Sequence, residues 1–217
     1  MLHDAQAADH APLVTRIRHE LKLRDLVVSA VEPLGPGFVA VTLQGEALAD
    51  FSSLGFDDHV KLMFGDAGEA QVRRDYTPRR FSREARTLTI EFALHGAGAA
   101  SDWARKAQPG DRLLVGGPRG SMIVPLTLGW HLLVGDATAL PAISRRLEEL
   151  PEDCRAFVFV LADQADRREL ASAARVEAHW AESNEALLAA LAGLALPAAD
   201  TGFAWGGGEA SLMARVR

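Results

Sequence analysis

The first half of the chain alternates apolar and polar residues with a period of two. The clearest case is the segment 86–95, RTLTIEFALH, in which Leu, Ile, Phe and Leu alternate with Thr, Thr and Glu. One apolar and one polar face predict a half-buried antiparallel strand. Similar runs, cut by Gly and Pro, occupy residues 25–31, 38–43, 59–64 and 112–115. Five or six such strands can close a small barrel, so we expect an antiparallel β-barrel over residues 1–125.

The pattern changes after Pro125. An apolar run at 130–134, typical of a buried strand, is followed by helical spacing over 138–150. The order of strand and then helix recurs after it. The further elements that we expect are strands at 156–161, 175–180 and 203–205 and a helix at 184–194. Strands that alternate with helices predict a small parallel-sheet α/β domain over 126–217. One helix interrupts the first half, and Ser101 is its expected N-cap.

Composition narrows the class of partner. Lys and Arg total 23 against 29 Asp and Glu, a net charge of -6, which disfavours broad binding to nucleic acid or to an anionic membrane. Cys154 is the only cysteine, so neither an internal disulfide nor a thiolate metal framework is available. The seven histidines lack metal-ligand spacing, and we predict no protein metal site.

The chain carries neither a membrane span nor a secretion signal in the usual pattern. No run approaches the roughly 20 apolar residues that a span needs. The first residues, MLHDAQAADHAPL, lack the basic and then apolar order of a signal peptide. We therefore expect a cytoplasmic monomer without membrane insertion.

Three stretches are candidates for chemistry. The segment 72–81, VRRDYTPRRF, places four arginines around the only tyrosine, which indicates either a local anion site or a solvated charged loop. GAGAA at 96–100 precedes a helix whose positive end suits a phosphate. GDATA at 135–139 ends a strand and opens a helix, where dinucleotides bind in α/β sheets; the alternative is an ordinary strand-to-helix turn.

These stretches resemble one family. RDYT at 74–77 matches the R-x-Y-[ST] signature of the ferredoxin-reductase-like flavoproteins, and RDYTPRRF resembles the siderophore-interacting proteins, their NAD(P)H-dependent ferric-siderophore reductase branch. LVGDATALPAI at 133–143 and WGGGEAS at 205–211 are similar as well. DDHVKL, HGAGAASDWA and GGPRGS lie between them in the family's order, so the likeness runs from about residue 22 to the end.

The resemblance implies FAD as the bound cofactor. It assigns Arg74 to the pyrophosphate, Tyr76 to packing against the isoalloxazine and Thr77 to the N5 region where hydride arrives, which makes Tyr76 and Thr77 the catalytic candidates. The other residues that it assigns to FAD are His95, Gly96, Ala100, Ser101 and Trp103. Two of these have a plain alternative, since His95 could be an ordinary polar group and Trp103 a core residue.

The resemblance also implies an NADPH or NADH site and a substrate site. The residues that it assigns to the nicotinamide cofactor are Asp136, Thr138, Ala139, Gly207 and Glu209. Both acids and arginines follow the second strand of this half, at 163–168, so the choice of nucleotide stays open, with NADPH preferred. Lys61 and Arg119 are expected to dock an anionic ferric siderophore; the alternative for each is an exposed charge without a role.

The implied activity is hydride transfer from NAD(P)H to FAD, followed by one-electron steps to Fe(III) in the siderophore. The alternatives are a general flavin reductase or electron-transfer flavoprotein, and a non-catalytic siderophore-binding protein of the same fold. Family sequences continue past GEAS, whereas this one ends at Arg217. Either the sequence is truncated or the subfamily differs, and we expect part of the nicotinamide side and one substrate-binding arginine to be missing.

Overall fold

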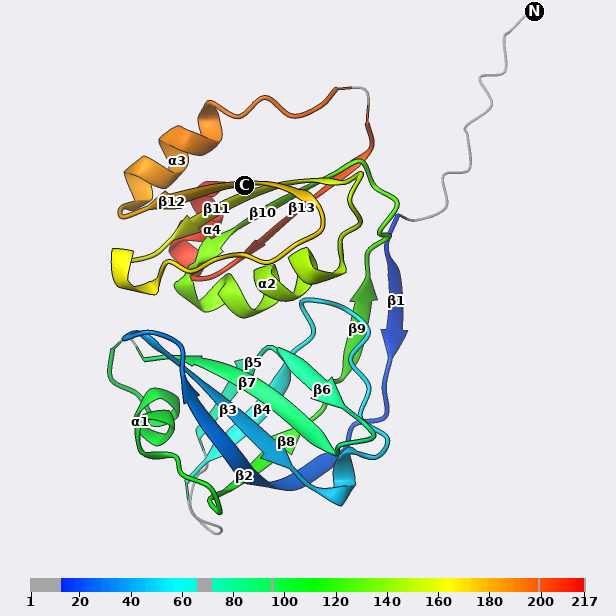
Figure 1. The fold of residues 1–217 in the computed structure, drawn as a ribbon, viewed down its shortest axis with the longest axis vertical. Coiled ribbons are helices and arrows are strands. Elements are labelled where there is room, and N and C mark those ends of the chain that lie inside the picture. Colours follow the sequence, from blue (N-terminus) through cyan, green and yellow to red (C-terminus); the bar gives the residue numbers. More distant parts are fainter. Residues whose placement is uncertain (1–12, 66–71, 95, 199, 217) are drawn as a thin grey trace, which may run out of the picture.

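The first half forms a curled antiparallel sheet of seven strands (Figure 1). The computed structural model describes residues 13–65, 72–94, 96–198 and 200–216. The strand order is β5-β4-β8-β2-β3-β7-β6. The bounds are β2 Leu23–Pro33, β3 Phe38–Gln44, β4 Val60–Phe64, β5 Val72–Tyr76, β6 Arg80–Ser82, β7 Thr87–Ala93 and β8 Arg112–Gly116, with a 3-10 turn at Glu46–Leu48. Within the described ranges β5 and β6 are the two edges, so the barrel is open there.

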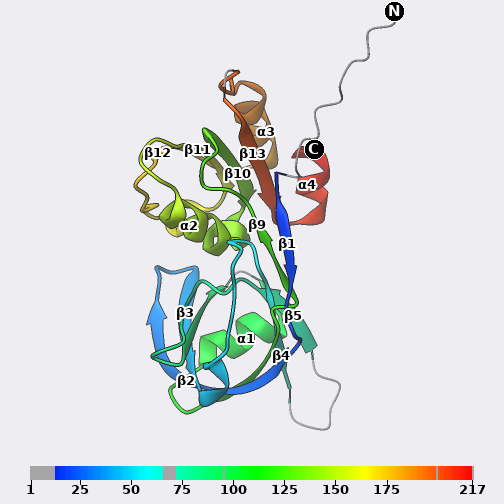
Figure 2. The same cartoon turned by 90° about the vertical axis from the view of Figure 1, so that its right-hand side faces the viewer.

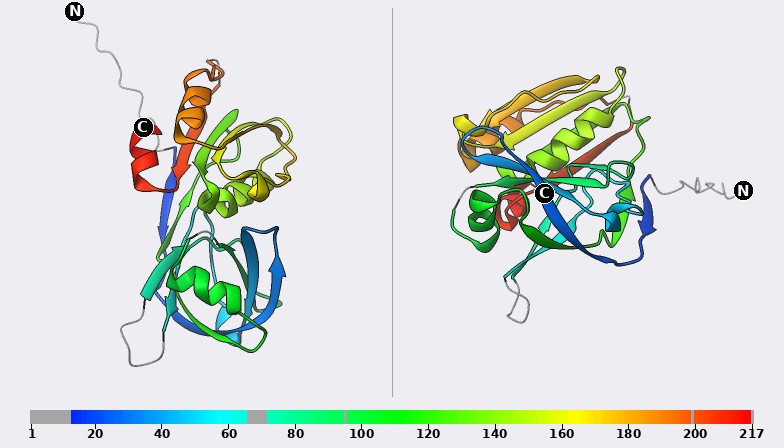
Figure 3. Two further views of the ribbon diagram at one scale, coloured as in Figure 1. Left: turned by 90° about the vertical axis from the view of Figure 1, so that its left-hand side faces the viewer. Right: turned by 60° about the horizontal axis from the view of Figure 1, so that its bottom comes forward.

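The alternation in the sequence explains the core of this half. Leu88, Ile90 and Phe92 of β7 are fully buried and share one hydrophobic cluster with residues of the other strands. Helix α1, Ala99–Lys106, packs against β3, β4 and β7 (Figure 3). The expectation that Ser101 caps this helix is wrong: Gly98 is the N-cap, and the Ser101 hydroxyl inside the first turn donates to the Gly98 carbonyl, 3.1 Å away.

The second half is a parallel four-stranded sheet with helices on both faces. Its order is β12-β11-β10-β13. Strands β11 and β12 therefore extend the sheet on one side of β10, and after β12 the chain crosses back to place β13 on the other side. The bounds are β10 Trp130–Asp136, β11 Arg155–Leu161, β12 Arg175–Ala181 and β13 Gly202–Gly207, with 3-10 turns at Ala137–Ala139 and Gln164–Asp166. Helix α2, Leu140–Glu149, covers the face toward the barrel, and α3, Asn184–Ala192, and α4, Ala210–Val216, cover the other (Figures 1 and 2).

A two-stranded ribbon runs beside both halves. Strand β1, Thr15–Arg18, pairs antiparallel with β9, Gly120–Ile123 (Figure 2). Strand β9 belongs to this ribbon and β10 to the parallel sheet, so the change of pattern near Pro125 falls between two different sheets. Phe38 and Phe56 of the barrel half lie in the same hydrophobic cluster as α2, which joins the two halves by apolar contact. No helix in the described parts of the chain is long and apolar enough to cross a membrane.

Candidate functional site: a flavin cavity beside a nucleotide cavity

One cavity of about 430 Å³ lies where β5, the start of α1 and the start of α2 meet. It brings together residues far apart in the sequence. Arg74, Tyr76 and Thr77 come from β5 and the turn after it. The other wall residues from the predicted set are Ala100, Ser101 and Thr138. Six residues predicted for cofactor binding therefore line one cavity between the two halves, which we call the flavin cavity.

Tyr76 presents a supported aromatic ring at this cavity. Its ring centroid lies 4.6 Å from that of Phe92, and Phe92 in turn lies 5.6 Å from Trp103. Burial raises the pKa of the Tyr76 phenol, although Arg74 acts in the opposite direction, so the hydroxyl stays protonated at neutral pH. The result is a neutral, rigid ring suited to packing against a flat heterocycle.

The same cavity holds two groups suited to a pyrophosphate. Arg74 is exposed, donates to the Arg73 carbonyl at 2.9 Å and has no acidic partner among the described residues. Helix α1 begins at Gly98 without a side-chain cap, which leaves the first-turn amides for a ligand or water. An unpaired guanidinium and an uncapped helix start on one cavity match the two negative charges of a dinucleotide pyrophosphate. The residues present fit FAD.

Other residues predicted for FAD do not line the cavity. Trp103 packs its ring near Phe64 at 5.8 Å and near Phe92, so it lies in the core behind Tyr76. Gly96 has φ +73° and belongs to the turn before α1 rather than to the cavity wall. His95 lies outside the described residues.

A second cavity, of about 460 Å³, opens at the carboxyl ends of β10, β11 and β12, where parallel α/β sheets bind nucleotides. Asp136 organises it. Oδ1 of Asp136 accepts from the Thr138 amide at 2.8 Å and the Thr138 hydroxyl at 2.5 Å, and Oδ2 accepts from the Glu209 amide at 2.7 Å. One carboxylate thus ties the turn after β10 to the turn after β13. A Cβ on Gly208, which has φ +138°, would come within 2.4 Å of Asp136 Oδ2, so that turn requires glycine.

Three residues predicted for the nicotinamide cofactor shape this region without lining the cavity. Ala139 is buried in the cluster beneath α2. Gly207 ends β13, and Glu209 accepts from the Ser211 hydroxyl at 2.7 Å. Thr138, in contrast, is exposed and lines both the nucleotide cavity and the flavin cavity. The two cavities therefore adjoin at one residue.

The nucleotide cavity is lined by acids, with one arginine beside it. Asp163, Asp166 and Glu182 line it. Arg167 pairs with Glu182 at 2.7 Å, which leaves a guanidinium beside the cavity. Arg168 points elsewhere: it pairs with Glu91 of the barrel at 2.7 Å.

The structure separates Lys61 from Arg119. Lys61 lies on β4 and holds Asp75, which lines the flavin cavity, at 2.7 and 3.0 Å. Arg119 instead lines a third cavity, of about 760 Å³, against the β1–β9 ribbon. The wall of this cavity reaches the other half through Asp57, which accepts a hydrogen bond from Trp205 Nε1 at 3.2 Å. Burial raises the pKa of Asp57.

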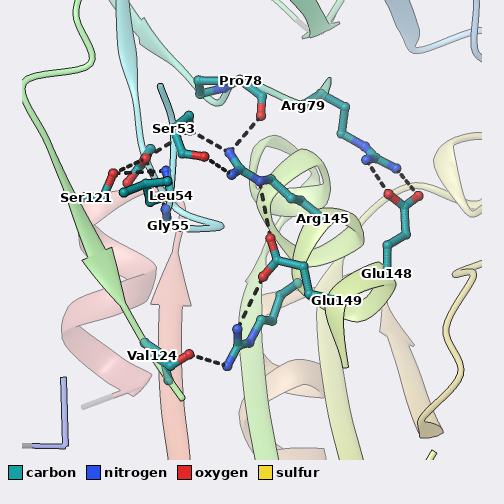
Figure 4. Close-up of polar contacts among 12 residues, drawn as sticks. Ser53, Leu54, Gly55, Pro78, Arg79, Ser121, Val124, Arg145, Glu148 and Glu149 are labelled. Atoms are coloured by element: carbon teal, nitrogen blue, oxygen red, sulfur yellow. Dashed lines mark hydrogen bonds and ion pairs between the residues drawn. The ribbon is translucent and has the colours of Figure 1, made fainter. Parts of the chain in front are cut away.

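Sequence reasoning missed the polar contacts that α2 makes with the barrel (Figure 4). Arg79 is buried; its two terminal nitrogens donate to Glu148 at 2.8 and 2.6 Å, and its Nε lies 3.0 Å from Glu91. Arg80 also pairs with Glu148. Two of the four arginines in VRRDYTPRRF therefore bind a helix of the other half. The helical spacing of SRRLEEL indicates that charged residues lie on one surface of α2. It does not indicate which residues of the barrel they contact.

An arginine of α2 holds the turn that carries Thr77. Arg145 donates to the Pro78 carbonyl at 3.1 Å, to the Ser53 carbonyl at 2.7 Å and to the Ser53 hydroxyl at 2.8 Å (Figure 4). Pro78 directly follows Thr77. The nucleotide half thus fixes the backbone at the edge of the flavin cavity.

Comparison with known proteins identifies the family. The model described as "Siderophore-interacting protein" matches residues 128–217, and "Siderophore-interacting FAD-binding domain" matches residues 27–73 and 66–122. The NADPH-dependent ferric-chelate reductase of Escherichia coli (strain K12) is 39% identical over 222 residues, which covers 91% of this chain and 86% of that protein. The chain belongs to the siderophore-interacting protein family. The resemblance expected from the sequence motifs is therefore confirmed.

Two further relatives are similar, one in structure and one in sequence. The crystal structure of a siderophore utilization protein from T. fusca has a TM-score of 0.86 and 36% identity, covering 94% of this chain and 88% of that one. Ferric vibriobactin reductase ViuB of Vibrio cholerae is 30% identical, over 64% of this chain and 59% of its own length. The predicted architecture, an FAD-binding antiparallel barrel followed by a parallel-sheet nucleotide fold, is confirmed.

Proposed function

We propose that the protein is a flavin-dependent oxidoreductase that uses NADPH to reduce Fe(III) held in a siderophore, acting as a monomer in the cytoplasm. In this proposal residues 1–125 bind FAD and residues 126–217 bind the nicotinamide nucleotide. The observation that carries it is Thr138, which lines both the flavin cavity and the nucleotide cavity. Ligands that occupy the two cavities would meet there, as hydride transfer requires. The relative's name, NADPH-dependent ferric-chelate reductase, supports the choice of donor and acceptor.

Bound FAD would supply the redox chemistry, accepting a hydride and passing electrons singly to iron. The chain's own residues bind the cofactor and orient it. Arg74 and the start of α1 would hold the pyrophosphate, the neutral ring of Tyr76 would pack against the isoalloxazine, and the Thr77 hydroxyl would be available to the flavin edge that accepts hydride; all three residues line the cavity. No proton acceptor or nucleophile from the protein is needed. Reduction lowers the charge on iron and weakens its hold by hard oxygen ligands, so the metal leaves an intact chelator.

The nucleotide half positions the donor. Asp136 holds the turns after β10 and β13 together, and Ala139, Gly207 and Glu209 shape those turns. We propose that the two turns form the surface on which the nicotinamide end of the nucleotide lies. For the substrate, Arg119 is proposed to contact the chelate directly. Lys61 is proposed as a second cation, at the edge of the flavin cavity through its pair with Asp75.

The test is an anaerobic visible spectrum of the protein supplied with FAD. We expect the flavin band to bleach with NADPH and to return as a ferric siderophore is consumed. Arg74→Gln should weaken FAD binding about tenfold to a hundredfold, because it removes charge-assisted hydrogen bonds worth about 1.5 to 3 kcal/mol. Arg73→Gln is the matched control, since Arg73 is exposed on the same strand but does not line the cavity. A protein that binds no flavin, or equal losses in both variants, would overturn the assignment.

A further inference from the structure

Basic side chains from three segments of the chain line the cavity beside the β1–β9 ribbon. At about 760 Å³ it is larger than the flavin cavity or the nucleotide cavity. Its basic residues are Arg16, Arg18, His19, His59 and Arg119. Arg16 and Arg18 come from β1, a short strand whose side chains are all exposed and which the sequence analysis did not predict. We call this space the ribbon cavity.

The arginines of the ribbon cavity have no acidic partners. Arg16, Arg18 and Arg119 make no ion pair with any residue that the structure describes. All three are exposed. The chain has more carboxylates than basic groups, with a net charge of -6, and yet these arginines are unpaired. Unpaired arginines on one cavity create a local positive potential that suits an anion.

The acids of the cavity wall make no ion pair with these arginines. Asp58 is buried, and its Oδ2 accepts from Ser53 at 2.9 Å, from the Gly55 amide at 3.1 Å and from the Ser121 hydroxyl at 2.5 Å. Burial raises the pKa of Asp57, which already receives a hydrogen bond from Trp205. Both carboxyls are thus engaged within the protein fold.

One wall of the cavity is held in place by a hydrogen-bond chain. His19 Nε2 lies 2.7 Å from the Ser121 hydroxyl, and that hydroxyl donates to Asp58. Because the Ser121 proton goes to Asp58, the His19 ring donates to Ser121 and the pair has no free nucleophile. The arrangement is a hydrogen-bonded wall beside exposed cations rather than a catalytic dyad.

The ribbon cavity and the flavin cavity both border the β4–β5 pair of strands. His59 directly precedes β4, and the next residue, Val60, is the register partner of Tyr76. His59 of the ribbon cavity is therefore one residue along the chain and one strand across from Tyr76 of the flavin cavity, with successive side chains directed to opposite faces of the sheet. This shared border suits the acceptor of electrons that leave the flavin.

We infer that Arg16 and Arg18 of β1 join Arg119 in a substrate site that selects ferric chelates with net negative charge, such as carboxylate or catecholate complexes, over neutral hydroxamate complexes. The inference rests on the proposed function and adds two specificity-determining residues to it. Guanidinium forks match carboxylate and catecholate oxygens. In a ferric hydroxamate the ligand charges only balance those of iron, so the same cations gain little from it.

Binding of a redox-inert analogue separates this site from the reaction. Gallium(III) citrate would be titrated calorimetrically into the oxidised, FAD-loaded protein, and KM would be measured for ferric citrate and for a neutral ferric hydroxamate. In the double variant Arg16→Gln/Arg18→Gln we expect about a tenfold or larger rise in the Kd of gallium citrate and the KM of ferric citrate. The KM of the hydroxamate should not change, and added salt should weaken citrate binding less than in the wild type.

Arg112→Gln is the matched control, because Arg112 is an exposed arginine paired with Asp25 on the barrel and outside the cavity. Three results would overturn the inference: unchanged gallium citrate binding in the double variant, equal losses for both chelates, or equally tight binding of metal-free citrate by the wild type. If gallium citrate binds as expected but ferric citrate is never reduced, the site stands and the proposed function fails. If reduction proceeds with unchanged KM in the double variant, the function stands and the site fails.

Discussion

Two groups of arginines in this protein differ in how they are partnered. At the junction of the halves, Arg79 is buried and its guanidinium contacts Glu148 (Figure 4). It also contacts Glu91. In the ribbon cavity, Arg16 and Arg18 are exposed and have no acidic partner among the described residues. A buried charge is stable only when it is paired, whereas an exposed one can wait for a ligand. The first group therefore holds the halves together, and the second is available for binding.

The arginine-rich stretch contains both kinds. Arg74 lies on the flavin cavity without an acidic partner, and Arg79, five residues later, is fully engaged with the other half. The turn after β5 separates them. Local density of charge in a sequence is thus a poor guide to function until the partner of each charge is known.

The largest expected effect is on stability, from removing a paired arginine. Arg79→Met removes the buried cation that contacts both Glu91 and Glu148, although Arg168 still contacts Glu91 and Arg80 still contacts Glu148. Breaking a buried pair costs about 3 to 5 kcal/mol, and we expect a loss near the lower end, about 3 kcal/mol, in chemical denaturation. Arg112→Gln, which removes an exposed pair, should change little. Equal losses in the two variants would erase the distinction between the groups.

A similar effect on the junction is expected from pH. His131 is buried beside Arg146, which donates to the Val124 and Pro125 carbonyls in the link between the halves. Burial, reinforced by Arg146, lowers the pKa of His131 to about 4, from 6.5 in the unfolded chain. Between these values the unfolded state binds more protons, so stability falls as pH falls, by on the order of 3 kcal/mol. The free energy of unfolding, measured by denaturation at several pH values in this window, should depend less on pH in His131→Leu than in the wild type. An unchanged dependence would show that His131 is not the titrating group.

A smaller effect, on rate, is expected from Arg145. Arg145→Met frees the Pro78 carbonyl beside Thr77, and we expect flavin reduction by NADPH to slow about tenfold, equivalent to about 1.4 kcal/mol. Arg145→Lys should recover part of the rate because one donor remains. The KM for ferric citrate should not move. If Arg145→Met alters only the denaturation midpoint, the contact is structural and does not position the turn.

Local patterns in the sequence predicted the long elements well. The alternation at 86–95 gave β7, and the apolar runs gave β10 and β11, because buried faces leave a periodic trace. Strands β1, β5, β6 and β9 were not predicted. They are short, and β1 has no buried side chain, so no hydrophobic period marks it. The N-cap was misplaced at Ser101 because Ala99 and Ala100 are good helix formers that allow α1 to begin earlier.

The candidate site was only partly predictable. Motifs nominated Arg74, Tyr76, Thr77 and Thr138, but whether they share a cavity depends on how the halves pack. The pairing of Arg79 with Glu148 and the shared cavity of Arg16 and Arg119 also bring together segments that are distant in the sequence. No local pattern reports them.

The most direct test measures the two half-reactions separately by rapid mixing. Wild type, Arg145→Met and Arg16→Gln/Arg18→Gln would each be loaded with FAD, mixed with NADPH, and then, once reduced, mixed with increasing ferric citrate. The account predicts that Arg145→Met slows only the bleaching of the flavin band, and that the double variant weakens only the dependence of its return on ferric citrate. If both variants change the same half-reaction, or if NADPH fails to bleach the wild-type flavin, the account is contradicted.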